Sequence, residues 1–74
     1  MEVNLNEHST LTRKAIREAG SQLKLAAKLK IAGGTVQSWA EGKRRVPPLR
    51  ALQLQALYPH IVSFREFYPK ALDI

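Results

Sequence analysis

The chain has 74 residues, no cysteine, 45% hydrophobic residues and a net charge of +6. This length fits one domain, which we place at residues 1–74, and leaves little room for a separate catalytic cleft. The lack of cysteine excludes disulfides, thiol catalysis and zinc sites with cysteine ligands. The hydrophobic fraction is enough for a packed core, so global disorder is not expected.

The positive charge is concentrated in the middle of the chain. Residues 13–50 hold ten lysine and arginine side chains against Glu18 and Glu41, a balance of +8. A local basic surface of this kind is typical of proteins that neutralise phosphates. The alternatives are a solvated basic surface or binding to an anionic membrane. Membrane binding is disfavoured because no strongly amphipathic basic helix with large apolar residues is present.

No targeting or membrane segment is evident in the sequence. No apolar run approaches the roughly 20 residues of a membrane span, and residues 1–20 lack the apolar core of a signal peptide. We therefore expect a cytoplasmic protein without a membrane partner.

The N-terminal part is predicted to contain an arm and one helix. Residues 1–8 are polar and aperiodic, which favours a flexible arm. Ser9 or Thr10 can cap a helix that runs to about Ala19, and Gly20 is a natural stop. The inward stripe of this helix is predicted to be Leu11, Ala15, Ile16 and Ala19.

Residues 21–42 predict two short helices joined by a tight turn. Ser21 can cap a helix over 22–29, in which we expect an inward apolar stripe. After a break at residues 30–32, a second helix over 33–41 would turn Val36 and Trp39 inward and end at Gly42. This arrangement is typical of a helix-turn-helix. The predicted inward stripe of the first motif helix consists of Leu23, Ala26, Ala27 and Leu29.

Residues 47–69 predict the C-terminal helices. Pro48 suits the first turn of a helix that continues to Pro59. Ser63 and Glu66 fit a capping box for a short helix that ends before Pro69. The β-branched and aromatic residues at 58–68 also suit a strand, but the capping box and the prolines favour helix. The predicted fold is therefore all-α, with about five helices.

The motif resembles a known family. The order Gln22, Leu25, Ala26, Ile31, Val36, Trp39 and Gly42, followed by basic residues and Val46-Pro47, is similar to Cro-type helix-turn-helix repressors of phages. It also resembles Cro-like regulators of bacterial prophages and toxin–antitoxin loci. The resemblance covers roughly residues 11–69. It implies a Cro- or lambda-repressor-like domain that binds a pseudo-palindromic operator as a homodimer and represses transcription.

Four residues depart from the family pattern, one in the turn and three at the start of the second motif helix. Lys30 stands where these motifs often carry glycine, because the residue there tends to have a positive φ. A lysine in that conformation costs roughly 1 kcal/mol. Ala32, Gly33 and Gly34 stand where family members carry polar side chains that contact bases. The glycines weaken the helix but allow the backbone to approach the duplex.

The candidate DNA contacts lie on and beside the second motif helix. The resemblance assigns a phosphate contact to Gln22, helped by the helix dipole. Thr35, Gln37 and Ser38 have side chains suited to base edges, whereas Trp39 falls at a core position. The basic run beyond Gly42 suits phosphates. The predicted DNA-binding residues are Gln22, Gly33, Gly34, Thr35, Gln37, Ser38, Lys43, Arg44 and Arg45.

Enzyme, metal and cofactor functions are not expected. His8 and His60 lie far apart, and no acid–base trio or phosphate-binding loop is evident. No small-molecule substrate is implied. We expect dimer contacts from the apolar C-terminal half, including Leu54, Phe64 or Phe67. The alternatives to a repressor are an antitoxin-like or other protein-interaction module and a nonspecific nucleic-acid binder.

Overall fold

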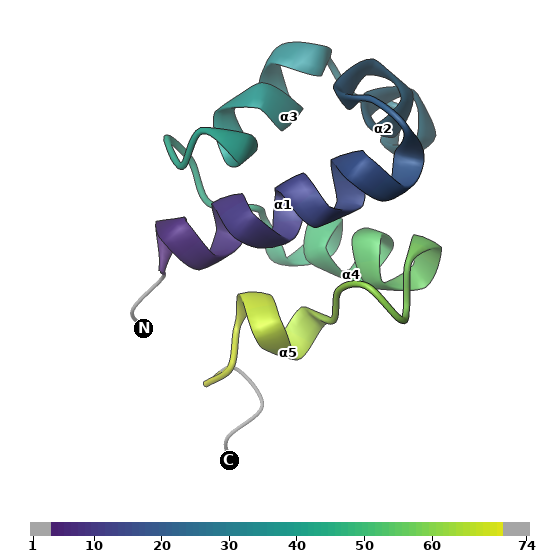
Figure 1. The fold of residues 1–74 in the computed structure, drawn as a ribbon. Coiled ribbons are helices and arrows are strands. Elements are labelled where there is room, and N and C mark those ends of the chain that lie inside the picture. Colours follow the sequence, from purple (N-terminus) through teal and green to yellow (C-terminus); the bar gives the residue numbers. More distant parts are fainter. Residues whose placement is uncertain (1–3, 71–74) are drawn as a thin grey trace.

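The fold consists of five helices and, within the described residues 4–70, no strand. In this computed structural model, α2 and α3 lie on one side of α1, whereas α4 and α5 lie on the other (Figure 1). This confirms the all-α prediction and excludes a strand over residues 58–68. The helices are α1 (Leu5–Ala19), α2 (Gln22–Leu29), α3 (Gly33–Ala40), α4 (Pro48–Leu57) and α5 (Phe64–Phe67).

The first helix begins earlier than predicted. Asn4 is its N-cap, and the Asn4 side chain accepts a hydrogen bond from the Glu7 backbone N–H at 3.1 Å. The prediction of a flexible arm is therefore wrong for residues 4–8, while residues 1–3 lie outside the described part of the chain. The predicted end is confirmed, because Gly20 closes α1 with a left-handed φ of 106°.

The core lies where the helix-turn-helix packs on α1. Trp39 is almost completely buried and Val36 is fully buried, so the prediction that they face inward is confirmed. From α1, Leu11 and Ala15 are fully buried against them. Because α1 contacts α2, α3 and α5, one apolar stripe on α1 joins both halves of the molecule.

The inward stripe of α2 differs from the predicted one. Leu25, Ala26 and Leu29 are buried, whereas Leu23 is 72% exposed and Ala27 is also exposed. Leu25 and Leu29 are four residues apart and therefore share one face of the helix. Burying this leucine pair orients α2 so that Leu23 points outward.

A buried histidine joins three segments of the chain. His8 Nδ1 accepts from the Val46 N–H at 2.9 Å, and His8 Nε2 bonds the Phe67 carbonyl at 2.8 Å. A carbonyl can only accept, so the imidazole is neutral with its proton on Nε2. Tyr68 completes the network by donating its hydroxyl to the Val46 carbonyl. Burial raises the pKa of that hydroxyl, although nearby Arg45 acts in the opposite direction.

The C-terminal helices form largely as predicted. Pro48 occupies the first turn of α4, and Ser63 and Glu66 form both bonds of a capping box at α5. Residues 4–70 contain no helix of the length and apolar character needed to cross a membrane.

Candidate nucleic-acid interface

The two motif helices end in the same local structure. Lys30 has φ 58° and ψ 45°, and the Ile31 N–H bonds the Ala26 carbonyl at 3.0 Å. Gly42 has φ 74°, and the Lys43 N–H bonds the Ser38 carbonyl at 2.9 Å. Both patterns are Schellman motifs, in which the left-handed position usually holds glycine. The turn therefore has the geometry usual for the family, and Lys30 adopts it with strain.

Gln22 connects α2 to the start of α3. Its side-chain nitrogen donates to the Gly33 carbonyl at 3.1 Å, and the side chain is half-buried. An amide nitrogen carries two donors, so one N–H remains for a phosphate. The structure thus gives Gln22 a positioning role that the sequence did not predict.

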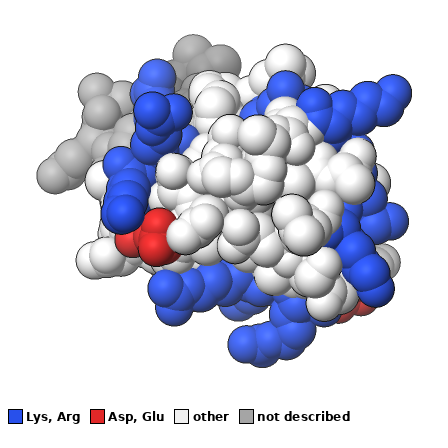
Figure 2. All heavy atoms as spheres, turned by 90° about the horizontal axis from the view of Figure 1, so that it is seen from above, with Lys and Arg blue, Asp and Glu red and all other residues white. Residues whose placement is uncertain are grey.

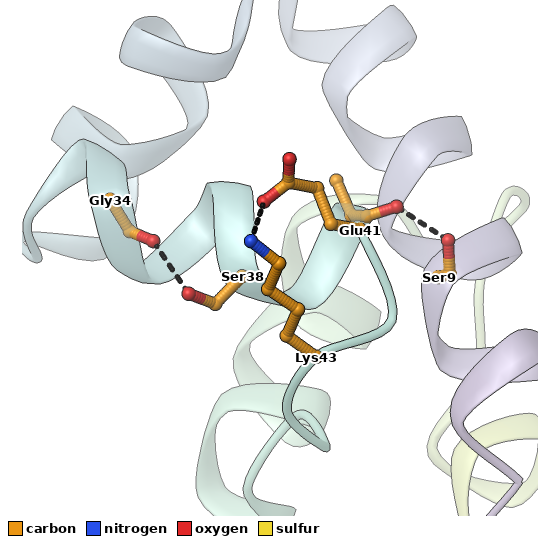
Figure 3. Close-up of polar contacts among 6 residues, drawn as sticks. Ser9, Gly34, Ser38, Glu41 and Lys43 are labelled. Atoms are coloured by element: carbon orange, nitrogen blue, oxygen red, sulfur yellow. Dashed lines mark hydrogen bonds and ion pairs between the residues drawn. The ribbon is translucent and has the colours of Figure 1, made fainter.

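The outward face of α3 presents one long polar side chain. With about 3.6 residues per turn, Gly34, Gln37 and Ser38 share this face, opposite the buried Val36. Gln37 is exposed, whereas Ser38 is half-buried and donates its hydroxyl to the Gly34 carbonyl at 3.1 Å (Figure 3). Thr35 is half-buried at the edge of this face. Among the predicted readers, Gln37 is therefore the best placed to reach a base edge.

The two glycines of α3 have different surroundings. A Cβ atom at Gly33 would lie 3.0 Å from Leu23 Cδ2, which is closer than side chains normally pack. A Cβ atom at Gly34 would meet nothing within 4 Å. The lack of a side chain at Gly33 thus makes room for Leu23, and only Gly34 leaves open space in front of the helix.

The C-terminal end of α3 is fixed to α1. The Ala40 carbonyl accepts from the Ser9 hydroxyl and, at 3.0 Å, from Arg13 Nε; the Ser9 contact is drawn in Figure 3. A positive guanidinium at a helix C-terminus is also favourable to the helix dipole. These contacts set the angle at which α3 projects from the domain.

The basic run after α3 is held beside the helix. The backbone N–H groups of Lys43 and Arg44 bond the Ser38 carbonyl at 2.9 and 3.4 Å. The side chains of Lys43, Arg44 and Arg45 are all exposed. Lys43 Nζ lies 3.5 Å from Glu41 (Figure 3), an exposed pair that contributes little stability. The end of α3 therefore fixes the backbone of Lys43 and Arg44, the first two cations of the run.

The face that carries α2 and α3 has a neutral centre and a basic rim. Figure 2 shows uncharged atoms across the middle of this face and lysine and arginine side chains around several sides of it. A face that binds duplex DNA needs such a distribution, with cations for the phosphates beside a groove and uncharged groups for the base edges. Within residues 4–70, no group of three or more acidic or histidine side chains could hold a metal ion.

The predicted dimer contacts are only partly accessible. Leu54 is fully buried and Phe67 nearly so, because both pack in the core of a single chain. The prediction that these two contact a partner is wrong, and Phe64 is half-buried. α4 instead exposes Leu49 and Leu52, at 63% and 47%. These two leucines, with the exposed Ala56, define the α4 outer face.

A comparison with protein families gives a match over most of the chain. A family model described as bacterial toxin YdaS matches residues 12–69, which is most of the chain and includes the whole helix-turn-helix. Neither the curated proteins nor the solved structures gave a match. The match fits a small helix-turn-helix protein such as phages encode; the narrower Cro-type resemblance rests on the motif residues alone. The chain belongs to the bacterial toxin YdaS family.

Proposed function

We propose that this protein is a sequence-specific regulator that binds duplex DNA with the α2–α3 face and represses transcription from a pseudo-palindromic operator. The observation that carries the proposal is the exposed Gln37 on α3, flanked by a basic run that is hydrogen-bonded to the same helix. A glutamine can pair bidentately with an adenine edge in the major groove.

The surrounding groups supply the phosphate contacts. Arg44 and Arg45 are exposed, with the Arg44 backbone bonded to the end of α3, and neither forms an ion pair with a carboxylate within residues 4–70. On the other side, Gln22 retains one side-chain N–H at the N-terminus of α2, where the helix dipole attracts anions. These contacts fix the register of the protein on the duplex, while Gln37 supplies sequence preference.

A second copy of the chain completes the binding unit in this proposal. The α4 outer face carries Leu49 and Leu52 and no charged side chain of its own; neighbouring Arg50 bonds the Leu29 carbonyl and Gln53. Two copies of a chain with net charge +6 repel each other less when they meet through a surface without exposed cations. This favours self-association through the α4 outer face. This face lies on a helix across α1 from α3 (Figure 1), so pairing through it leaves the α2–α3 face open.

Selection from a pool of randomised DNA duplexes tests the proposed function. We expect enrichment of an inverted repeat, which should then be protected in a footprint of the DNA flanking the gene for this protein. Enrichment of no sequence, with uniform affinity across duplexes, would overturn the proposal and favour a nonspecific nucleic-acid binder.

A protein-interaction module is the second candidate. Two observations favour it: the family is described as a bacterial toxin, and α4 exposes a leucine face. If expression of this protein arrests bacterial growth, the two candidate functions predict that different residues are needed for the arrest. If arrest follows from DNA binding, Arg44→Ala should relieve it and Leu52→Lys should matter less. If arrest follows from capture of a protein through α4, the order should reverse.

A further inference from the structure

We propose that Leu23 contacts the methyl group of a thymine in the major groove and so contributes to the choice of DNA site. The inference rests on the proposed function and names a specificity residue on α2, outside the helix that carries Gln37. It starts from the 72% exposure of Leu23, the highest among the large apolar side chains in residues 4–70.

The position of Leu23 relative to α3 carries the argument. A Cβ atom at Gly33 would lie 3.0 Å from Leu23 Cδ2. One methyl group of Leu23 therefore lies next to Gly33, the first residue of α3. The apolar side chain of Leu23 on α2 thus lies beside the first turn of α3, where Gly33 and Gly34 have no side chains.

The first turn of α2 is held in place by its own hydrogen bonds. The Ser21 hydroxyl accepts from the Lys24 N–H at 3.1 Å, and the Gln22 side chain donates to the Gly33 carbonyl at 3.1 Å. The Gln22 side chain and the Lys24 backbone, on either side of Leu23, are therefore both held by hydrogen bonds. A side chain presented from a rigid element binds with less loss of conformational entropy.

The chemistry of the groove identifies the group that Leu23 would contact. The thymine C5-methyl is the apolar group that base pairs present in the major groove, and cytosine lacks it. Leu23 lies on α2 beside the first residue of α3, and the face that carries these two helices has a neutral centre with lysine and arginine around it (Figure 2). In the proposed complex these cations bind the phosphates on either side of the groove, so the base edges between them face Leu23.

The test uses thymidine and deoxyuridine, two nucleosides that differ by this methyl group alone. In the best duplex selected by the wild-type protein, each thymine is replaced in turn by deoxyuridine, and affinities are measured for wild type and for Leu23→Ala. We expect one thymine per half-site at which the replacement weakens wild-type binding about threefold to fivefold, since one buried methylene contributes about that factor. The same replacement should leave the affinity of Leu23→Ala unchanged.

Leu5→Ala is the matched control, because it removes the same atoms from another exposed leucine, on α1 and outside the α4 outer face, and should keep the full response to deoxyuridine. Wild type that prefers its selected duplex but responds to deoxyuridine at no position would overturn the Leu23 inference and leave the proposed function standing. An equal response in wild type and Leu23→Ala would assign the methyl contact to another residue. Wild type without any duplex preference would overturn both.

Discussion

Lys30 holds a left-handed conformation that glycine adopts without strain. It closes α2 as Gly42 closes α3, so the two ends differ mainly in side chain. Replacing Lys30 with glycine should raise the free energy of unfolding by up to about 1 kcal/mol, despite the loss of a charge. Urea titration measures this difference. Lys30→Ala is the control, since it removes the same charge but keeps the strain and should give little or none of the gain. Clear destabilisation by glycine would contradict the assigned geometry.

His8 is the residue whose removal should cost the most among the buried polar groups. Its imidazole bonds the Val46 N–H and the Phe67 carbonyl, which both lose their partner in His8→Ala. Each buried group left without a hydrogen bond costs about 1–3 kcal/mol. In a domain of this size we therefore expect a much lower midpoint in urea or loss of folding.

The exposed His60 provides the comparison for His8. His60→Ala should change the free energy of unfolding by no more than about 0.5 kcal/mol. A His8→Ala protein as stable as His60→Ala would show that the buried network does not hold α1, the Val46 segment and α5 together.

At the scale of the elements, the residue ranges of the motif helices were predicted more accurately than the faces that they bury. The range of α2 follows from Ser21 and from the turn at Lys30, which are local signals. The outward position of Leu23 could not be predicted from periodicity alone, because both Leu23 and Leu25 can begin an apolar stripe in so short a helix. Packing on α1 selects Leu25. That choice determines which leucine faces DNA in the proposed complex.

The start of α1 and the role of His8 differ from the prediction for different reasons. Asn4 and Glu7 are spaced as an N-cap and an acid of the first helical turn, a local signal for a helix that begins before Ser9. The partners of His8 lie 38 and 59 residues away in the sequence. No local pattern reports such contacts, so the role of His8 depends on the tertiary fold.

The α4 outer face should carry the dimer contact. Leu52→Lys adds a cation to this face without disturbing the buried Leu54, so the fold should persist while pairing fails. Sedimentation with a duplex that carries two half-sites about 34 Å apart should show two wild-type proteins bound cooperatively. The variant should bind the two half-sites independently and more weakly.

Leu5→Lys makes the same change at an exposed leucine of α1 and should retain cooperative binding. One wild-type protein per duplex at saturation would contradict pairing through any surface. Equal loss of cooperativity in both variants would show that added charge, rather than the α4 outer face, is responsible.

At the scale of the whole molecule, the proposed DNA-binding face uses different side chains for sequence recognition and for attraction to phosphates. Gln37 lies on the exposed side of α3, and Arg44 lies in the basic run bonded to the end of that helix. Both side chains are exposed, so truncation to alanine should leave the fold intact. The two variants should therefore differ in how they lose DNA binding.

The direct measurement is a set of binding isotherms for wild type, Gln37→Ala and Arg44→Ala on the selected duplex and on an unrelated one, across several salt concentrations. Gln37→Ala should lose about 1–3 kcal/mol on the selected duplex and little on the other. Arg44→Ala should weaken both equally and reduce the salt slope by about one. Equal weakening of both duplexes by Gln37→Ala, or no preference in the wild type, would contradict sequence recognition through α3.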